Sequence, residues 1–258
     1  MNKIYDRIYE YYNLLESDEY EVVGVFLFGS QNYGLDSEES DIDAKAIVVP
    51  TFDDICENSP ATNKHIKFED GSTLVVKDIR LYCKELKKQG LSTLETLFTK
   101  YSYVNHKYRK IWDMLQSIAE PICRYDTVQC VRAFVGTISN QFNFLKNSIE
   151  YEDNIRYKSL CSMQFHRQML YRYIDGESFE DILKLEHLND LHKTKFDCTL
   201  SAQEVMSVAQ SILEESIITK EDFIESFDEF GEDHKAEVDF VLDETIKLAI
   251  GKSFTLVK

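Results

Sequence analysis

The chain has 258 residues, 43% of them hydrophobic, and a formal net charge of −17 at pH 7. That length suits one large domain or two small ones, and the apolar content argues against an intrinsically disordered chain. The negative charge argues against broad, sequence-independent binding to DNA or RNA. No apolar run approaches the roughly 18 residues of a membrane-spanning helix, and the N-terminus has no apolar signal segment. We therefore expect a soluble, cytoplasmic protein with no membrane partner.

The first hundred residues predict a small mixed sheet. Residues 4–15 carry apolar side chains at helical spacing. The β-branched and aromatic run 22–28 predicts a buried strand, and a polar loop follows at 31–40. Residues 41–49 predict a second strand that Pro50 ends. Segments 66–68 and 72–76 flank the turn pair Asp70-Gly71, which indicates a hairpin.

From residue 79 onward the apolar spacing is mostly helical. Helices are predicted at 79–89, 93–98, 108–118, 127–148, 155–175, 202–216 and 234–250. A run of strands followed by a run of helices predicts an α/β (α+β) fold. We expect a core with a small mixed sheet in residues 1–104 and a C-terminal helical bundle in residues 105–258.

The six cysteines form no CxxC pair and no cluster with zinc-ligand spacing. Most of them lie within apolar patterns, as Cys83 and Cys161 do. We expect them to be reduced thiols in the core.

A Gly-Ser pair ends the first predicted strand. Gly29 lets a ligand approach the backbone closely because glycine has no Cβ. If a helix begins just after it, exposed N–H groups and the Ser30 hydroxyl can hold phosphate oxygens. The segment is not a Walker A loop, since no GxxxxGK[ST] pattern is present.

Asp41 and Asp43 lie two residues apart at the start of the second predicted strand, which places both carboxylates on one face. Neighbouring carboxylates repel unless a cation neutralises them, and magnesium prefers a few carboxylates plus substrate phosphates. An isolated Asp-x-Asp is usually an exposed strand end. Combined with the Gly-Ser pair, it predicts a site for phosphoryl or nucleotidyl transfer.

The stretch Gly29-Ser30 followed by Ser40-Asp41-Ile42-Asp43 resembles the hallmark of the polymerase β-like nucleotidyltransferase superfamily. The additional Tyr33-Gly34 resembles the predicted nucleotidyltransferases of the RNA-ligase-associated group. Weaker matches to that group are Asp78-Ile79-Arg80-Leu81-Tyr82 with Leu94-Glu95-Thr96-Leu97-Phe98, and Lys158 with His166-Arg167. The resemblance covers about the first hundred residues well and the helical part in patches. It departs from the group at Gly90-Leu91-Ser92-Thr93, where an Asn-Pro commonly precedes the Leu-Glu.

The resemblance implies a transfer assisted by two metal ions, Mg²⁺ or Mn²⁺. Asp41 and Asp43 would hold the metals, and Asp78 would complete the site as a ligand and as a candidate base. Gly29 and Ser30 would bind the β- and γ-phosphates of an NTP. An acceptor hydroxyl would attack the α-phosphate, and pyrophosphate would leave.

Three further residues are candidates for nucleotide binding: Tyr33, Lys158 and His166. Lys158 and His166 lie about two turns apart on one predicted helix, so both could reach one cleft. Helical histidines are more often hydrogen-bonded structural residues, and Asp78 has a second interpretation as the N-cap of the helix that begins at residue 79.

Basic residues gather between Lys100 and Arg172, and four of them lie on the predicted helix 155–175: Arg156, Lys158, Arg167 and Arg172. They indicate either a local positive pocket for a polyphosphate or solvated helix faces.

The leading hypothesis is an enzyme that moves an NMP group from an NTP to an acceptor hydroxyl on a small molecule, an RNA end or a protein, without extended DNA binding. The alternative is a catalytically weak nucleotide-binding or regulatory module with the same fold. A metal-dependent phosphohydrolase is disfavoured because no HD motif or histidine-rich metal cluster appears.

Overall fold

The computed structural model describes residues 3–37, 40–147, 152–227 and 234–254. The chain divides into two compact units. Unit 1 comprises Met1–Asn32, Asp36–Tyr125 and Glu232–Lys258, and unit 2 comprises Tyr33–Leu35 and Asp126–Gly231. This division differs from the predicted boundary after residue 104, because residues 105–125 and the last helix belong to unit 1.

Unit 1 is built on a mixed five-stranded sheet with the order β3-β4-β2-β1-β5. The strands are β1 (Glu21–Leu27), β2 (Ala44–Val49), β3 (Asn63–Lys67), β4 (Thr73–Asp78) and β5 (Ser102–Val104). β2 runs antiparallel to β1 and parallel to β4, and β3 and β4 form the predicted antiparallel hairpin. Because β2 and β4 are parallel, the start of β2 lies beside the start of β4, and the end of β2 lies beside the end of β4.

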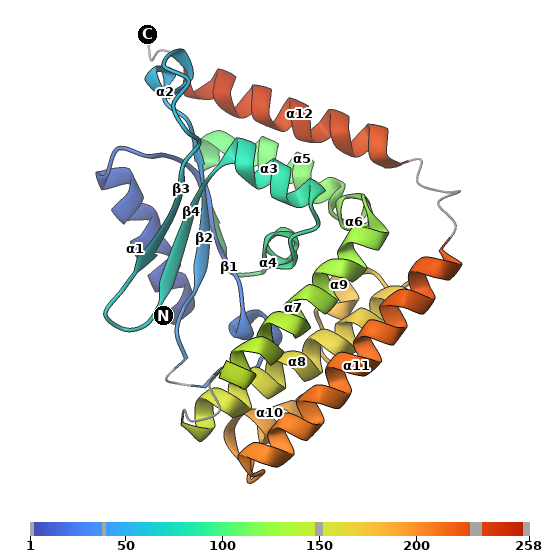
Figure 1. Cartoon of the computed structure of the whole chain (residues 1–258). Coiled ribbons are helices and arrows are strands. Elements are labelled where there is room, and N and C mark those ends of the chain that lie inside the picture. Colours follow the sequence, from blue (N-terminus) through green and yellow to red (C-terminus); the bar gives the residue numbers. More distant parts are fainter. Residues whose placement is uncertain (1–2, 38–39, 148–151, 228–233, 255–258) are drawn as a thin grey trace. The chain divides into compact units, whose positions relative to one another are not determined.

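The two faces of the sheet have different chemistry. On one face, alternate residues of β1, β2 and β4, among them Val25, Ala46 and Val76, form an apolar cluster with α1 (Lys3–Ser17). The other face carries Phe26, which stacks on Trp112 of α5 (Arg109–Ser117), and the buried Lys45. Figure 1 shows α1 on one side of the sheet and α3 (Ile79–Lys87) and α4 (Leu91–Leu94) on the other.

The remaining elements of unit 1 are short, apart from the last helix. They are η1 (Ser30–Tyr33), α2 (Phe52–Cys56), η2 (Glu95–Leu97), η3 (His106–Tyr108), α6 (Ala119–Cys123) and α12 (His234–Ser253). Helix α12 returns to this unit, where Asp239 pairs with Lys87 of α3 at 2.7 Å and accepts a hydrogen bond from Tyr125 at 3.0 Å.

Among its described residues, the regular elements of unit 2 are all helices. Its elements are α7 (Thr127–Asn147), α8 (Asp153–Ile174), α9 (Phe179–Ile182), α10 (Leu188–Phe196) and α11 (Ala202–Ser226). Helices α7, α8 and α11 share an apolar cluster that includes Ile138, Leu160 and Ile212. Residues 33–35 join this unit, since Lys195 donates a hydrogen bond to the Leu35 carbonyl and His192 bonds that of Gly34 at 2.7 Å.

All six cysteines are free thiols, as predicted. Cys83, Cys123, Cys130 and Cys161 are buried, whereas Cys56 is exposed, so the expectation of core positions is wrong for Cys56. Across the described residues, no helix has the length and apolar character needed to cross a membrane.

Candidate functional site

The Gly-Ser turn lies directly beside Asp43. β1 pairs with β2 so that Leu27 faces Ala44, and one residue further the Phe28 N–H donates to the Asp43 carbonyl at 3.1 Å. Gly29 follows with φ +90°, a left-handed conformation that favours glycine. The chain then enters the short helix η1 at Ser30. The sheet register therefore brings the predicted phosphate-binding turn to the start of β2.

Asp43 is held by the first residue of β4. The Thr73 N–H donates to Asp43 Oδ1 at 2.8 Å, and the carboxylate is partly buried. This bond orients the side chain toward the sheet face that carries Lys45, and Asp43 lines a hollow of about 600 Å³ on that face.

Asp41 is exposed and lies beside the β3–β4 turn. Gly71 has φ +89°, a left-handed conformation that favours glycine, and a Cβ added there would stand 2.7 Å from Asp41 Oδ1, so the carboxylate lies close to this turn. Gln31 Nε2 donates to the Asp41 carbonyl at 3.0 Å and so ties η1 to this segment. Asp41 lines a different hollow, on the α1 side of the sheet beside Arg7, whereas Asp43 lines the hollow on the Lys45 side. β2 begins only at Ala44, so strand alternation does not govern residues 41–43, and the expectation that both carboxylates lie on one face is wrong.

The structure separates Asp78 from the other two aspartates. Because β2 and β4 are parallel, Asp78 pairs with Val48 near the end of β2, whereas Asp43 lies beside Thr73 at the start of β4. Five residues of strand correspond to roughly 16 Å. Asp78 instead caps α3, accepting the Arg80 N–H at 2.8 Å and pairing with the Arg80 guanidinium at 2.7 Å. Of the two interpretations of Asp78, the structure supports the helix cap, and the expectation that it completes the site with Asp41 and Asp43 is corrected.

A buried carboxylate supports the Gly-Ser turn. The Gly29 N–H donates to Glu95 Oε1 at 3.1 Å, and Glu95 is only 3% exposed. Glu95 belongs to η2, just after α4. The sequence resemblance included the Leu94-Glu95 pair but gave it no role, because only the fold brings these two segments together.

The described residues offer few ligands for a metal ion. Within the described ranges, no group of three or more His, Cys, Asp or Glu side chains could hold a metal. Asp41 and Asp43 offer oxygen ligands, and Mg²⁺ is often bound through one or two carboxylates together with substrate phosphates. Because Asp41 and Asp43 line different hollows, only the Asp43 carboxylate lies beside the Gly29-Ser30 turn as a ligand for an ion shared with nucleotide phosphates. Asp78 is too distant to help hold that ion.

Tyr33, Lys158 and His166 all belong to unit 2. The ring of Tyr33 lies 5.3 Å from that of Phe165 on α8, between centroids, and Lys158 is exposed on the same helix. His166 Nδ1 donates to the Ser162 carbonyl at 2.7 Å. Burial lowers the pKa of His166 to about 4, so the imidazole is neutral at pH 7 and offers no charge to a phosphate.

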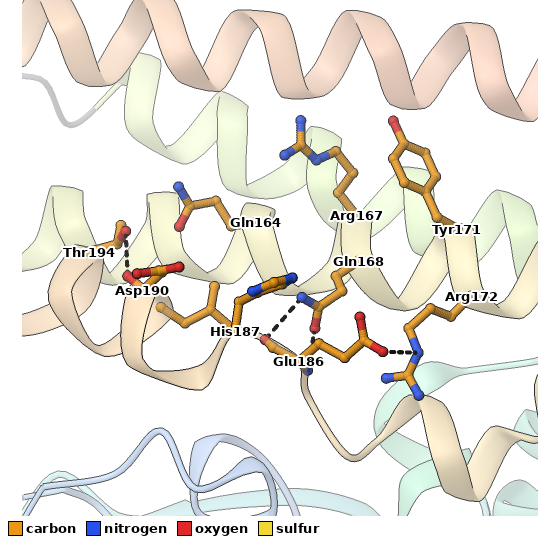
Figure 2. A pocket seen from close by; sticks show the side chains of 10 residues that line it. Gln164, Arg167, Gln168, Tyr171, Arg172, Glu186, His187, Asp190 and Thr194 are labelled. Carbon is orange, nitrogen blue, oxygen red and sulfur yellow. Dashed lines mark hydrogen bonds and ion pairs between the residues drawn. The ribbon is translucent and has the colours of Figure 1, made fainter.

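Acidic partners neutralise much of the predicted basic patch on α8. Arg156 pairs with Asp153, Arg167 with Glu215 at 2.7 Å, and Arg172 with Glu177 at 2.6 Å. A hollow of about 410 Å³ lies beside α8 and α10. Figure 2 shows the side chains that line it, among them Arg172, which also approaches Glu186. These ion pairs argue against a positive pocket, and the mostly buried Arg156 and Arg172 do not form a solvated helix face either.

Comparisons with known proteins leave the family open. No protein-family model matches the chain, and no curated protein shows significant similarity to it. A solved nucleotidyltransferase-like protein from Exiguobacterium sibiricum 255-15 is similar over 90% of this chain and 86% of its own, with 11% sequence identity and a TM-score of 0.36. At that TM-score the two folds are not shown to be the same, and the function proposed below rests on this chain's own residues.

Proposed function

We propose that this protein is a metal-dependent nucleotidyltransferase that moves an NMP group from an NTP to an acceptor hydroxyl. One observation carries the proposal: the 3.1 Å bond from the Phe28 N–H to the Asp43 carbonyl. It holds the Gly29-Ser30 turn next to Asp43, which supports a site where donors suited to phosphate and a carboxylate suited to a hard cation act together.

The turn binds the phosphates. Gly29 has no Cβ to obstruct the ligand, and the Ser30 hydroxyl and the first N–H groups of η1 are donors suited to phosphate oxygens. Glu95 holds the turn in place by accepting the Gly29 N–H. The phosphate-binding donors are therefore already ordered before the nucleotide binds, which lowers the entropy cost of binding. Tyr33, Lys158 and His166 remain candidates for contacts with the nucleotide.

Asp43 supplies the carboxylate that holds a Mg²⁺ or Mn²⁺ ion together with the nucleotide phosphates, and Asp41 adds negative charge two residues away. When bound, that ion would stabilise the charge that develops on the phosphate oxygens during transfer. The Thr73 N–H keeps Asp43 oriented, and the Gln31 amide keeps the backbone of residue 41 in place. A neighbour in unit 1 thus holds the Asp43 carboxylate itself, whereas at residue 41 the bond holds the backbone.

Transfer from an α-labelled NTP tests the proposal. Purified protein is incubated with each of the four NTPs and with cell RNA, protein extract or a small-molecule extract, and label in the acceptor fraction is counted. Asp43→Asn is the test variant, and Asp36→Asn is its matched control because Asp36 is an exposed carboxylate in the preceding loop. Nucleotide binding without transfer to any fraction would contradict the proposal and favour the catalytically weak binding module.

A further inference from the structure

Three lysines and two carboxylates line the hollow beside Asp43, so its charged groups are mostly basic in a protein whose net charge is −17. It has a volume of about 600 Å³ and lies over β2, β3 and β4, next to α3 and α4. Its titratable lining consists of Lys45, Lys77, Lys88, His65, Asp43 and Glu85. Pockets of about 300–1,000 Å³ are the usual size for small-molecule ligands.

A buried lysine forms the floor of this hollow. Lys45 is 3% exposed, and its Nζ donates to Thr93 Oγ1 at 2.7 Å and to the Ser92 carbonyl at 3.0 Å. Lys77 lies on the neighbouring strand and pairs with Glu85. Burying a cation is costly, and these polar contacts hold the Lys45 ammonium in one place on the sheet face.

Asp43 stands between this hollow and the Gly29-Ser30 turn. It lines the hollow through its side chain and bonds Phe28 through its carbonyl, whereas Gly29 and Ser30 are absent from the lining. Phe28, the residue before Gly29, also lines the hollow, so the hollow begins directly beside the turn that holds the NTP phosphates, where an acceptor would approach.

We propose that this hollow binds the acceptor substrate, and that the acceptor is a small molecule carrying a hydroxyl and an anionic carboxylate or phosphate group. This inference rests on the proposed function. The anionic group lies against the exposed Lys88 and is attracted by the charge of the buried Lys45, and the acceptor oxygen forms a bond to the α-phosphorus. The bond from that phosphorus to pyrophosphate breaks, and the hydroxyl proton passes to water.

Binding of inorganic phosphate and of acetate to the full chain, without NTP, tests the site. Phosphate or acetate is titrated into labelled protein while the amide NMR signals of residues 43–45 and 92–93 are followed, with neutral glycerol as the uncharged probe. We expect both anions, but not glycerol, to shift these signals. Lys45→Met should raise the dissociation constant at least about tenfold, and Lys88→Gln by about threefold.

Lys84→Gln is the matched control, because Lys84 is an exposed lysine of α3 that does not line the hollow. It should leave anion binding unchanged. Equal anion binding by the parent, Lys45→Met and Lys88→Gln would overturn the inference. If Lys45→Met does not fold, Lys88→Gln alone tests it. Displacement of the anions by NTP would assign the hollow to the nucleotide and would also overturn it.

The two proposals fail in different ways. If Asp43→Asn abolishes NMP transfer but anion binding does not depend on Lys45 or Lys88, the acceptor assignment is wrong and the proposed function stands. If the anions bind in the hollow but no acceptor is labelled, the proposed function is wrong and the hollow is an anion site only.

Discussion

The Gly29 N–H donates a hydrogen bond to Glu95 Oε1 across 66 residues of sequence, at 3.1 Å. Removing the carboxylate leaves the turn without this partner. We expect Glu95→Ala to cost about 1 to 3 kcal/mol in the free energy of unfolding and to raise the KM for NTP. Chemical denaturation and steady-state kinetics measure the two effects.

Glu95→Gln separates positioning from simple packing. Its side-chain oxygen still accepts the Gly29 N–H, so KM should return toward the parent value. An Ala variant that loses stability but keeps the parent KM would show that Glu95 serves the fold and not the turn.

Asp78 is expected to matter for stability and not for the reaction. Asp78→Ala removes the N-cap of α3 and a partner of Arg80, which should lower the free energy of unfolding by about 1 to 3 kcal/mol. The rate per folded molecule should stay within about twofold of the parent, measured at a temperature where both are folded. Because asparagine also caps helices, Asp78→Asn should recover part of the stability; a folded Asp78→Asn protein without activity would restore Asp78 to the site.

The contrast between Asp43 and Asp78 marks the limit of prediction from sequence. Strand patterns predicted β1, β2 and the β3–β4 hairpin, because buried β-branched runs and an Asp-Gly turn are local signals. Whether β4 runs parallel to β2 is not a local property, and that direction places Asp78 at the far end. The motif residues were therefore found, but not all of them lie at the same edge of the sheet.

A short strand and two contacts between segments distant in sequence could not be predicted, for related reasons. β5 (Ser102–Val104) has three partly buried residues and is defined by its pairing with β1. Helix α12 was predicted as a helix, but its place in unit 1 depends on contacts such as Asp239 with Lys87. Glu95 gained a role in the same way, since its partner Gly29 is distant in sequence.

His166 should make stability depend on pH. Its pKa is about 4 in the folded protein, because burial disfavours the charged imidazole, against an ordinary value near 6.5. Between those values the unfolded chain binds a proton that the folded chain does not, so stability falls as pH drops from about 6.5 to about 4 and this contribution is then constant. Denaturant titrations at several pH values give the free energy of unfolding of the parent and of His166→Phe. Across that window this free energy should fall more steeply with falling pH in the parent than in the variant. Identical slopes would show that His166 titrates normally.

Metal binding should depend on the nucleotide. One or two carboxylates alone hold Mg²⁺ or Mn²⁺ weakly, and substrate phosphates supply the remaining ligands. Titration of Mn²⁺, followed by electron paramagnetic resonance, should show tighter binding with a non-hydrolysable NTP analogue, and Asp43→Asn should weaken it. Zinc should substitute poorly, because softer metals prefer nitrogen and sulphur ligands. Stoichiometric zinc in purified protein, held by Cys or His, would contradict this site.

The most direct test is NMP transfer from α-labelled NTP by the Asp43→Asn protein beside Asp36→Asn. Losing one carboxylate that balances the charge of the metal and phosphates removes several kcal/mol of transition-state stabilisation, a factor on the order of 100 or more in rate. We predict that loss for Asp43→Asn, with its thermal unfolding close to that of the parent, and no loss for Asp36→Asn. Equal transfer by a folded Asp43→Asn protein and the parent would contradict the account.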